Sequence, residues 1–198
     1  MDDSLINKFG YSEMYEWVNI PPANKKLGRF VQFDENEPEK IRIAIDDKRI
    51  VGITTVNSTV DSDCPDEWPS KNLQNEYGDI YLKKERLAVG AKVYDQFEEI
   101  SYINTKPWEH LIPIENESYD KKQKYNKRSV RQEWTRVNIL GKAIVFDNGE
   151  CTPGEYCKPY IGKDMKKAGQ AIPANENDKI KYYVIGRFSE KTIIILNK

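Results

Sequence analysis

The sequence has little histidine and cysteine and no long apolar run, and each shortage excludes a class of protein. His110 is the only histidine among 198 residues, so one chain cannot build a multi-histidine zinc site, and a serine or cysteine triad could use only His110 as its base. Three cysteines do not make a disulfide framework in a chain of this length, which favours a reducing compartment. No run approaches the ~20 apolar residues of a membrane span, and the acidic start is not typical of a secretory signal.

The sequence also lacks an excess of either charge. It contains 31 Lys and Arg against 32 Asp and Glu, a formal net charge of −1. General nucleic-acid binders carry a basic excess, so we do not expect nucleic acid as the partner. The mean hydropathy of −0.76 is low, yet 12 Tyr, 6 Phe and 4 Trp supply the aromatic anchors that disordered chains lack. The composition therefore predicts a folded domain with many polar excursions.

Short runs rich in β-branched residues, separated by turn signals, predict a mainly β fold. Residues 29–33, 41–45 and 50–56 have the alternation of strands and predict an antiparallel meander. Residues 181–185 and 192–196 predict a last hairpin, and the apolar run of its second strand predicts burial on both faces. Between these clusters, Asn148-Gly149 is typical of the turn in a tight hairpin.

The middle of the chain, residues 61–136, has a different character. Four acidic residues near its start form a patch with no basic neighbour: Asp61, Asp63, Asp66 and Glu67. Residues 119–136 hold seven Lys or Arg against two acidic residues. No segment shows helical periodicity for more than two turns. We therefore expect a compact antiparallel β domain, a meander plus C-terminal hairpins, with long irregular excursions in residues 61–136.

Two carboxylates near the start of the chain are candidates for catalysis. Glu13 and Glu16 lie in the acidic and aromatic segment YSEMYEW, residues 11–17. Three residues apart, they would share a face in a helical turn and point oppositely in a strand. Two carboxylates held close together can divide the roles of acid and base, because the charge of one raises the pKa of the other. The alternative is a pair of solvated glutamates beside aromatic core residues.

Two other features allow more than one interpretation. Cys151 and Cys157 flank a Pro-Gly turn, where they could pack as small residues, form a disulfide or supply two metal ligands. The basic stretch 121–136 includes Tyr125 and Trp134, a mixture that suits a nucleotide or a nucleic-acid backbone. It could equally be a solvated segment that complements the acidic patches, within the chain or on a neighbouring subunit.

An ordered set of motifs resembles a known family. The segments are YSEMYEW (11–17), GRFV (28–31), KIRIA (40–44), LGK (140–142), DNGECTPGEYCKP (147–159), AIPA (171–174) and YVIGR (183–187). This set is similar to the peptidase G2 domain, the intramolecular-chaperone autoproteolytic domain at the C-terminus of bacteriophage tailspikes and neck appendages. The resemblance covers about residues 10–198.

The resemblance implies a viral structural or assembly protein that promotes trimerisation of the spike ahead of it. Such domains then cut the chain just before their own start, and Glu13 and Glu16 match the acidic residues thought to carry the cut, as in a glutamic-type endopeptidase. The expected partners are further copies of the chain, in a trimer, and other virion proteins, with no membrane, cofactor or metal. The expected location is the virion or the cytoplasm of the infected host cell.

The sequence departs from the family pattern at its start. Gly10 stands where the family usually has Asp before the tyrosine, and nine residues precede it. We expect residues 1–9 to form an N-terminal arm and residues 10–198 to form the peptidase G2-like domain. The chain is then either a segment of a longer protein that cleaves itself, or a structural protein that keeps the fold without proteolysis. A nucleotide or nucleic-acid binding module is the remaining alternative and ranks last.

Overall fold

The computed structural model describes residues 10–197 apart from 57, 66, 95–99, 104, 106–107 and 123. The expected arm, residues 1–9, and Asp66 of the acidic patch lie outside the described residues. The chain divides into two compact units, Met1–Pro65 with Asn126–Lys198 and Asp66–Tyr125. The mainly β class is confirmed, since strands account for almost all of the regular structure in both units.

The first unit contains one large sheet. Its strands are β1 (Tyr11–Trp17), β2 (Phe30–Phe33), β3 (Lys40–Ile43), β4 (Ile50–Thr55), β5 (Val60–Ser62), β10 (Trp134–Phe146), β11 (Tyr156–Pro159), β12 (Ala171–Pro173), β13 (Tyr182–Ser189) and β14 (Thr192–Asn197). They follow the order β12-β11-β13-β14-β10-β4-β2-β3-β1-β5. Two single 3-10 turns, η2 (Ala23–Lys25) and η3 (Arg128–Val130), lie between strands.

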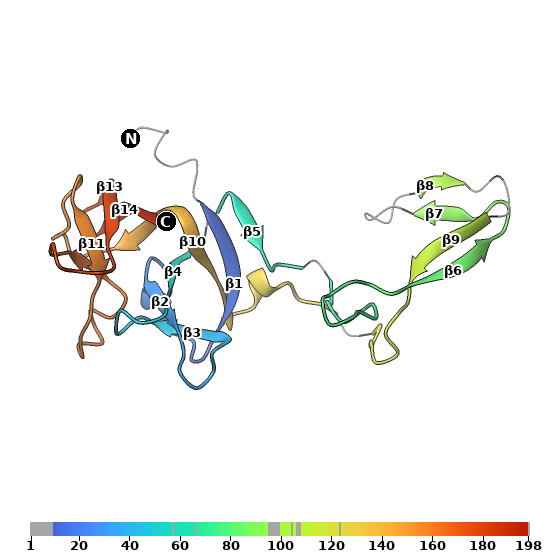
Figure 1. Cartoon of the computed structure of the whole chain (residues 1–198), viewed down its shortest axis with the longest axis horizontal. Helices are drawn as coiled ribbons and strands as arrows, with labels where there is room; N and C mark the ends of the chain where they lie inside the picture. Colours follow the sequence, from blue (N-terminus) through green and yellow to red (C-terminus); the bar gives the residue numbers. More distant parts are fainter. Residues whose placement is uncertain are drawn as a thin grey trace. The chain divides into compact units, whose positions relative to one another are not determined.

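Part of this sheet closes on itself. Strand β10 pairs antiparallel with both β4 and β1, so β1, β10, β4, β2 and β3 form a closed ring; Figure 1 shows β1 and β10 side by side. All five strands contribute to an apolar cluster: Trp17, Val31, Ile41 and Val137, with the partly buried Tyr15, Phe33, Ile43, Val51 and Ile139. The alternation in residues 41–43 explains this placement, because Ile41 is fully buried while Arg42 lies next to Asp34 on the other side of its strand.

The order of the first strands differs from a simple meander. Strand β2 pairs antiparallel with both β3 and β4, so β2 is central and β3 and β4 are not neighbours. The free edge of β3 pairs instead with β1, in parallel, which closes the ring. In a meander, β4 would pair with this edge of β3; here β1 pairs with it instead.

The C-terminal hairpin is confirmed, and the turn at Asn148-Gly149 is not a hairpin. Strands β13 and β14 pair antiparallel, and Ile193, Ile194 and Ile195 are all buried, as the apolar run predicted. Gly149 has the positive φ expected of a tight turn, 96°. The flanking strands β10 and β11 pair with β14 and β13 rather than with each other, so this turn leads the chain away from β10.

A close backbone crossing fixes the start of the ring. The second half of β10, from Gly141 onward, leaves β1 and pairs with β14. At this point Gly10 and Gly141 touch: a Cβ on Gly10 would lie 1.6 Å from the Leu140 carbonyl oxygen, and a Cβ on Gly141 would lie 2.8 Å from the Gly10 Cα. A side chain at Gly10 would therefore require the backbone to move.

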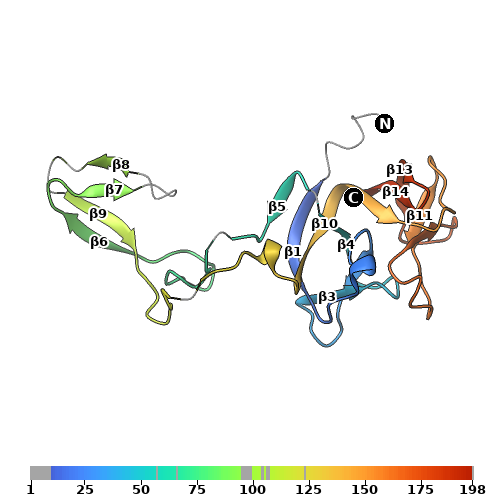
Figure 2. The same cartoon turned by 180° about the vertical axis from the view of Figure 1, so that it is seen from behind.

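The second unit holds two antiparallel ribbons within the middle segment. Strand β6 (Leu82–Leu87) pairs with β9 (Trp108–Pro113), and β7 (Lys92–Tyr94) pairs with β8 (Ile100–Ile103), as Figures 1 and 2 show. The long excursions expected in residues 61–136 thus contain short paired strands and no described helix longer than a single 3-10 turn. His110 lies on β9 opposite Glu85. Strand β6 is almost wholly exposed, which agrees with its charged sequence.

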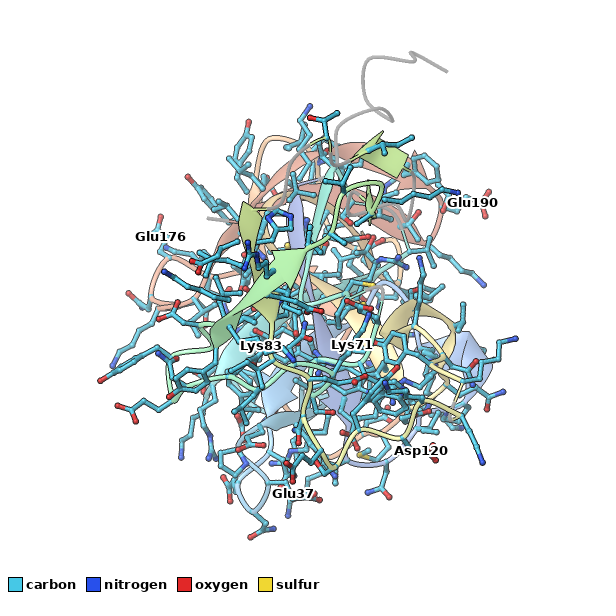
Figure 3. The ribbon with its side chains drawn as sticks, turned by 90° about the vertical axis from the view of Figure 1, so that its right-hand side faces the viewer. Glu37, Lys71, Lys83, Asp120, Glu176 and Glu190 are labelled. Carbon is cyan, nitrogen blue, oxygen red and sulfur yellow. The ribbon has the colours of Figure 1, made fainter. Side chains whose placement is uncertain are left out.

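Charged loops at the surface of the first unit explain the low mean hydropathy. Glu37, Glu176 and Glu190 lie on turns between strands, and Figure 3 shows them at the periphery of the view. All three are exposed. No described helix is long and apolar enough to cross a membrane.

Candidate active site

A gap in strand pairing lies along the outer edge of β1. One edge of β1 pairs with β10 from Tyr11 to Glu16. The other edge pairs in parallel with β5 at residues 11–13 and with β3 at residues 16–17. Within the described residues, Met14 and Tyr15 have no strand partner on this second edge. A cavity of about 270 Å³ opens at the gap, lined by Glu13, Met14, Tyr15, Glu16, Glu39, Lys40, Asp63 and Trp134.

Glu13 is held in this cavity by two tyrosines. Because side chains alternate along a strand, Tyr11, Glu13 and Tyr15 share one face of β1. The Tyr11 hydroxyl donates a hydrogen bond to Oε1 of Glu13 at 3.0 Å, and the Tyr15 hydroxyl donates to Oε2 at 2.7 Å. Burial and the hydrogen bond to Glu13 raise the pKa of Tyr15 well above its usual range, so Tyr15 stays a hydrogen-bond donor. Each carboxylate oxygen of Glu13 therefore has a fixed position.

Glu16 lies on the opposite face of β1 and has different neighbours. Lys40 Nζ lies 3.3 Å from Oε1 of Glu16 and 2.8 Å from Oε2 of Glu37. Hydrogen bonds to Glu37 and Glu16 raise the pKa of Lys40. The strand conformation thus separates Glu13 from Glu16, one of the two outcomes considered from their spacing. Both side chains nevertheless line the cavity, because it opens at the strand edge.

Asp63 and Glu39 are two further carboxylates at the cavity, and sequence reasoning assigned neither to a site. Asp63 is the one beside Glu13. It follows β5, whose parallel pairing brings Ser62 level with Glu13. Its carboxylate forms an ion pair with Arg128, and its carbonyl oxygen accepts a hydrogen bond from the same guanidinium at 3.2 Å. Only the long-range pairing of β5 with β1 places Asp63 there, so no local spacing in the sequence could indicate it.

The acidic patch has basic partners within the chain, which agrees with the interpretation of the basic stretch as a complement to it. Arg136 Nε lies 2.8 Å from Oδ2 of Asp61, and Arg128 pairs with Asp63. The guanidinium of Arg128 also stacks over the ring of Trp134, 4.0 Å from its centroid. These arginines come from the basic stretch considered for nucleotide binding and are already engaged within their own unit. They therefore give no support to an intersubunit charge contact through these groups.

The two cysteines near the Pro-Gly turn are buried in a second apolar cluster. Cys151 and Cys157 are free thiols, 3% and 0% exposed, packed with residues that include Ile193 and Ile195. A hydrogen bond with Cys151, together with burial, raises the pKa of the Cys157 thiol well above its usual range. This arrangement agrees with the interpretation as packing residues. Across the described residues, no group of three or more His, Cys, Asp or Glu side chains is placed to hold a metal ion.

Comparison with known proteins identifies the family. The model of the peptidase G2 family, described as the IMC (intramolecular chaperone) autoproteolytic cleavage domain, matches residues 4–193. The chain belongs to this family. No curated protein sequence matches it.

Two crystal structures from bacteriophage phi29 share the fold of this peptidase G2 domain. The C-terminal fragment of gene product 12 is 20% identical, with a TM-score of 0.65 over 95% of this chain and 99% of the fragment. Pre-mature gene product 12 is 18% identical, with a TM-score of 0.67 over 96% of this chain. This chain spans only 21% of that pre-mature chain.

Proposed function

We propose that this peptidase G2 domain is the assembly domain of a phage tailspike or neck-appendage protein. It promotes trimerisation of that protein and then separates from it by autoproteolysis. The family match over residues 4–193 supports this proposal, together with a carboxylate-lined cavity on the strand that opens the domain. Its partners are further copies of the chain and other virion proteins, and its location is the virion or the infected cell.

The cavity supplies the groups that peptide hydrolysis needs. In such a reaction one carboxylate takes a proton from water as the water oxygen attacks the carbonyl carbon. A second, protonated carboxyl group gives its proton to the amide nitrogen as the C–N bond breaks. Glu13 and Glu16 are the candidates from the sequence, and both line the cavity. Glu13 is the better placed of the two, because the tyrosine hydroxyls orient both of its oxygens.

The distance along β1 bears on which peptide is cut. At ~3.3 Å per residue, the bond before Gly10 lies ~10 Å or more along the strand from Glu13, farther than a glutamate side chain extends. The Gly10 amide also donates a hydrogen bond to the Lys142 carbonyl oxygen at 3.2 Å, which fixes the start of the strand. We infer that the peptide entering the cavity comes from a neighbouring copy, so that cleavage follows trimerisation.

The test is to express the chain together with the coding sequence that precedes it and to follow intact mass and light scattering. The proposal predicts a trimer and a released fragment that begins near Gly10. A Glu13→Gln, Glu16→Gln double variant should remain trimeric and uncleaved, whereas Glu176→Gln, at an exposed loop, should cleave as the wild type does. Cleavage by the double variant would refute the residue assignment. A wild type that stays intact would refute the proteolysis, and a monomer would refute the assembly role.

A further inference from the structure

We propose that Asp63 is the second catalytic carboxylate of this cavity and acts with Glu13. This inference rests on the autoproteolytic function proposed above. It gives Glu16 a positioning role through its ion pair with Lys40.

The backbone directs Asp63 to the cavity. Strand β5 ends at Ser62, level with Glu13 on β1, and Asp63 is the next residue. Asp63 has φ = 54°, in the left-handed region that residues other than glycine seldom adopt. Such conformations persist where the surrounding structure imposes them, and they are concentrated at functional sites. The chain thus turns at Asp63, where its side chain joins Glu13 in lining the cavity.

Arg128 fixes the Asp63 carboxylate while leaving it accessible to water. The guanidinium contacts both the carboxylate and the carbonyl oxygen of Asp63, and it is itself held over the ring of Trp134. The Asp63 side chain remains 55% exposed, although its arginine partner is only 19% exposed. Asp63 is therefore an oriented carboxyl group in contact with solvent, which suits a base that activates water.

The open edge of β1 points to a peptide as the ligand of this cavity. Between β5 and β3, Met14 and Tyr15 line the cavity and have no strand partner on that edge among the described residues. Extended peptides bind such edges by adding a strand through main-chain hydrogen bonds. A peptide added at this gap would cross the cavity between the strand that carries Glu13 and the segment that carries Asp63.

The two carboxyl groups balance the reaction as follows. The Asp63 carboxylate takes a proton from water as the water oxygen bonds to the scissile carbonyl carbon. Glu13, oriented by the hydroxyls of Tyr11 and Tyr15, in its acid form gives a proton to the amide nitrogen as the C–N bond breaks. One water is consumed, and the products are a carboxylic acid and an amine. Asp63 then returns its proton to solvent and Glu13 regains one.

The experiment compares aspartates in the full chain expressed with its preceding segment. Asp63→Asn should lower the cleavage rate about 100-fold or more and leave the trimer mass unchanged. Asp61→Asn is the matched control, because Asp61 also loses an ion pair, with Arg136, but does not line the cavity. Should Asp63→Asn fail to assemble, Asp63→Ala is measured instead, with the same expected loss.

Reading assembly and cleavage separately distinguishes catalysis from structure. The trimer mass and thermal midpoint of Asp63→Asn should match those of the wild type, while its cleavage rate should not. Cleavage by Asp63→Asn at the wild-type rate, or an equal loss in Asp61→Asn, would overturn the assignment of Asp63. With either of these two outcomes, the proposed autoproteolysis would still stand as long as the wild type is cleaved. An uncleaved wild type would instead refute the proposed proteolysis, and with it this assignment.

Discussion

The ion pair between Asp147 and Arg187 offers a sharp test of what stabilises the first unit. The Asp147 side chain is fully buried and lies 3.0 Å from both terminal nitrogens of Arg187. It also accepts a hydrogen bond from the Cys151 amide at 3.0 Å. Burial by itself would raise the pKa of Asp147, but the hydrogen bonds from Arg187 and the Cys151 amide hold it below its usual range.

We predict that Asp147→Asn lowers the free energy of unfolding by about 3 kcal/mol at pH 7. Breaking a buried pair costs about 3–5 kcal/mol, because the remaining charge is left uncompensated. We take the lower end because the asparagine oxygen can still accept one hydrogen bond. The measurement is urea unfolding followed by tryptophan fluorescence, where a slope of about 1–3 kcal/mol per molar gives a midpoint shift of about 1–3 M.

The pH dependence and a double variant complete this test. Since folding lowers the pKa of Asp147, its contribution is full above the unfolded value of about 3.9 and is lost as the pH falls through the folded value. The difference between wild type and Asp147→Asn should therefore shrink in acid. Asp147→Leu combined with Arg187→Met should recover only part of the loss, because the buried Cys151 amide is left without its acceptor. A cost below about 1 kcal/mol at pH 7, or a difference that persists unchanged in acid, would refute the reasoning.

Three further changes test other parts of the account. Gly10→Ala should lower the thermal midpoint of unfolding, because the added Cβ would lie 1.6 Å from the Leu140 carbonyl oxygen. Overpacking of this kind costs about 1–3 kcal/mol. An unchanged midpoint would contradict the close approach of Gly10 to β10. Tyr15→Phe removes a hydrogen-bond donor to Glu13 and should slow cleavage about ten-fold, measured by intact mass. An unaltered cleavage rate would argue against the role of Tyr15 in orienting Glu13. The Cys157 thiol, buried and with a raised pKa, should react with a maleimide only after unfolding, and rapid labelling of the native protein would contradict its placement.

The elements that the sequence predicted are those determined by local pattern. Residues 41–43 alternate between buried or partly buried isoleucines and a charged residue, as a strand with one buried face does. Residues 192–196 are an apolar run rich in β-branched residues, and their strand is buried on both faces. The ring could not be predicted, because it depends on β1 pairing with β10 and with β3, contacts between segments far apart in the chain. No propensity in either segment specifies such a partner.

The candidate site was predicted in part for the same reason. Glu13 and Glu16 were selected from a short motif, and the strand then placed them on opposite faces of β1. Asp63 reaches the cavity only through the parallel pairing of β5, and its partner Arg128 lies 65 residues away. Counting charges by segment therefore suggested separate acidic and basic patches, where the fold instead makes ion pairs within the first unit.

The central claim is that this peptidase G2 domain assembles a trimer and then cuts its neighbour's chain. Native mass spectrometry of the chain with its preceding segment, compared with the Glu13→Gln variant, tests it most directly, because assembly and cleavage are read in one spectrum. The account predicts a cleaved trimer for the wild type and an intact trimer for the variant. An intact monomer in both samples would contradict it.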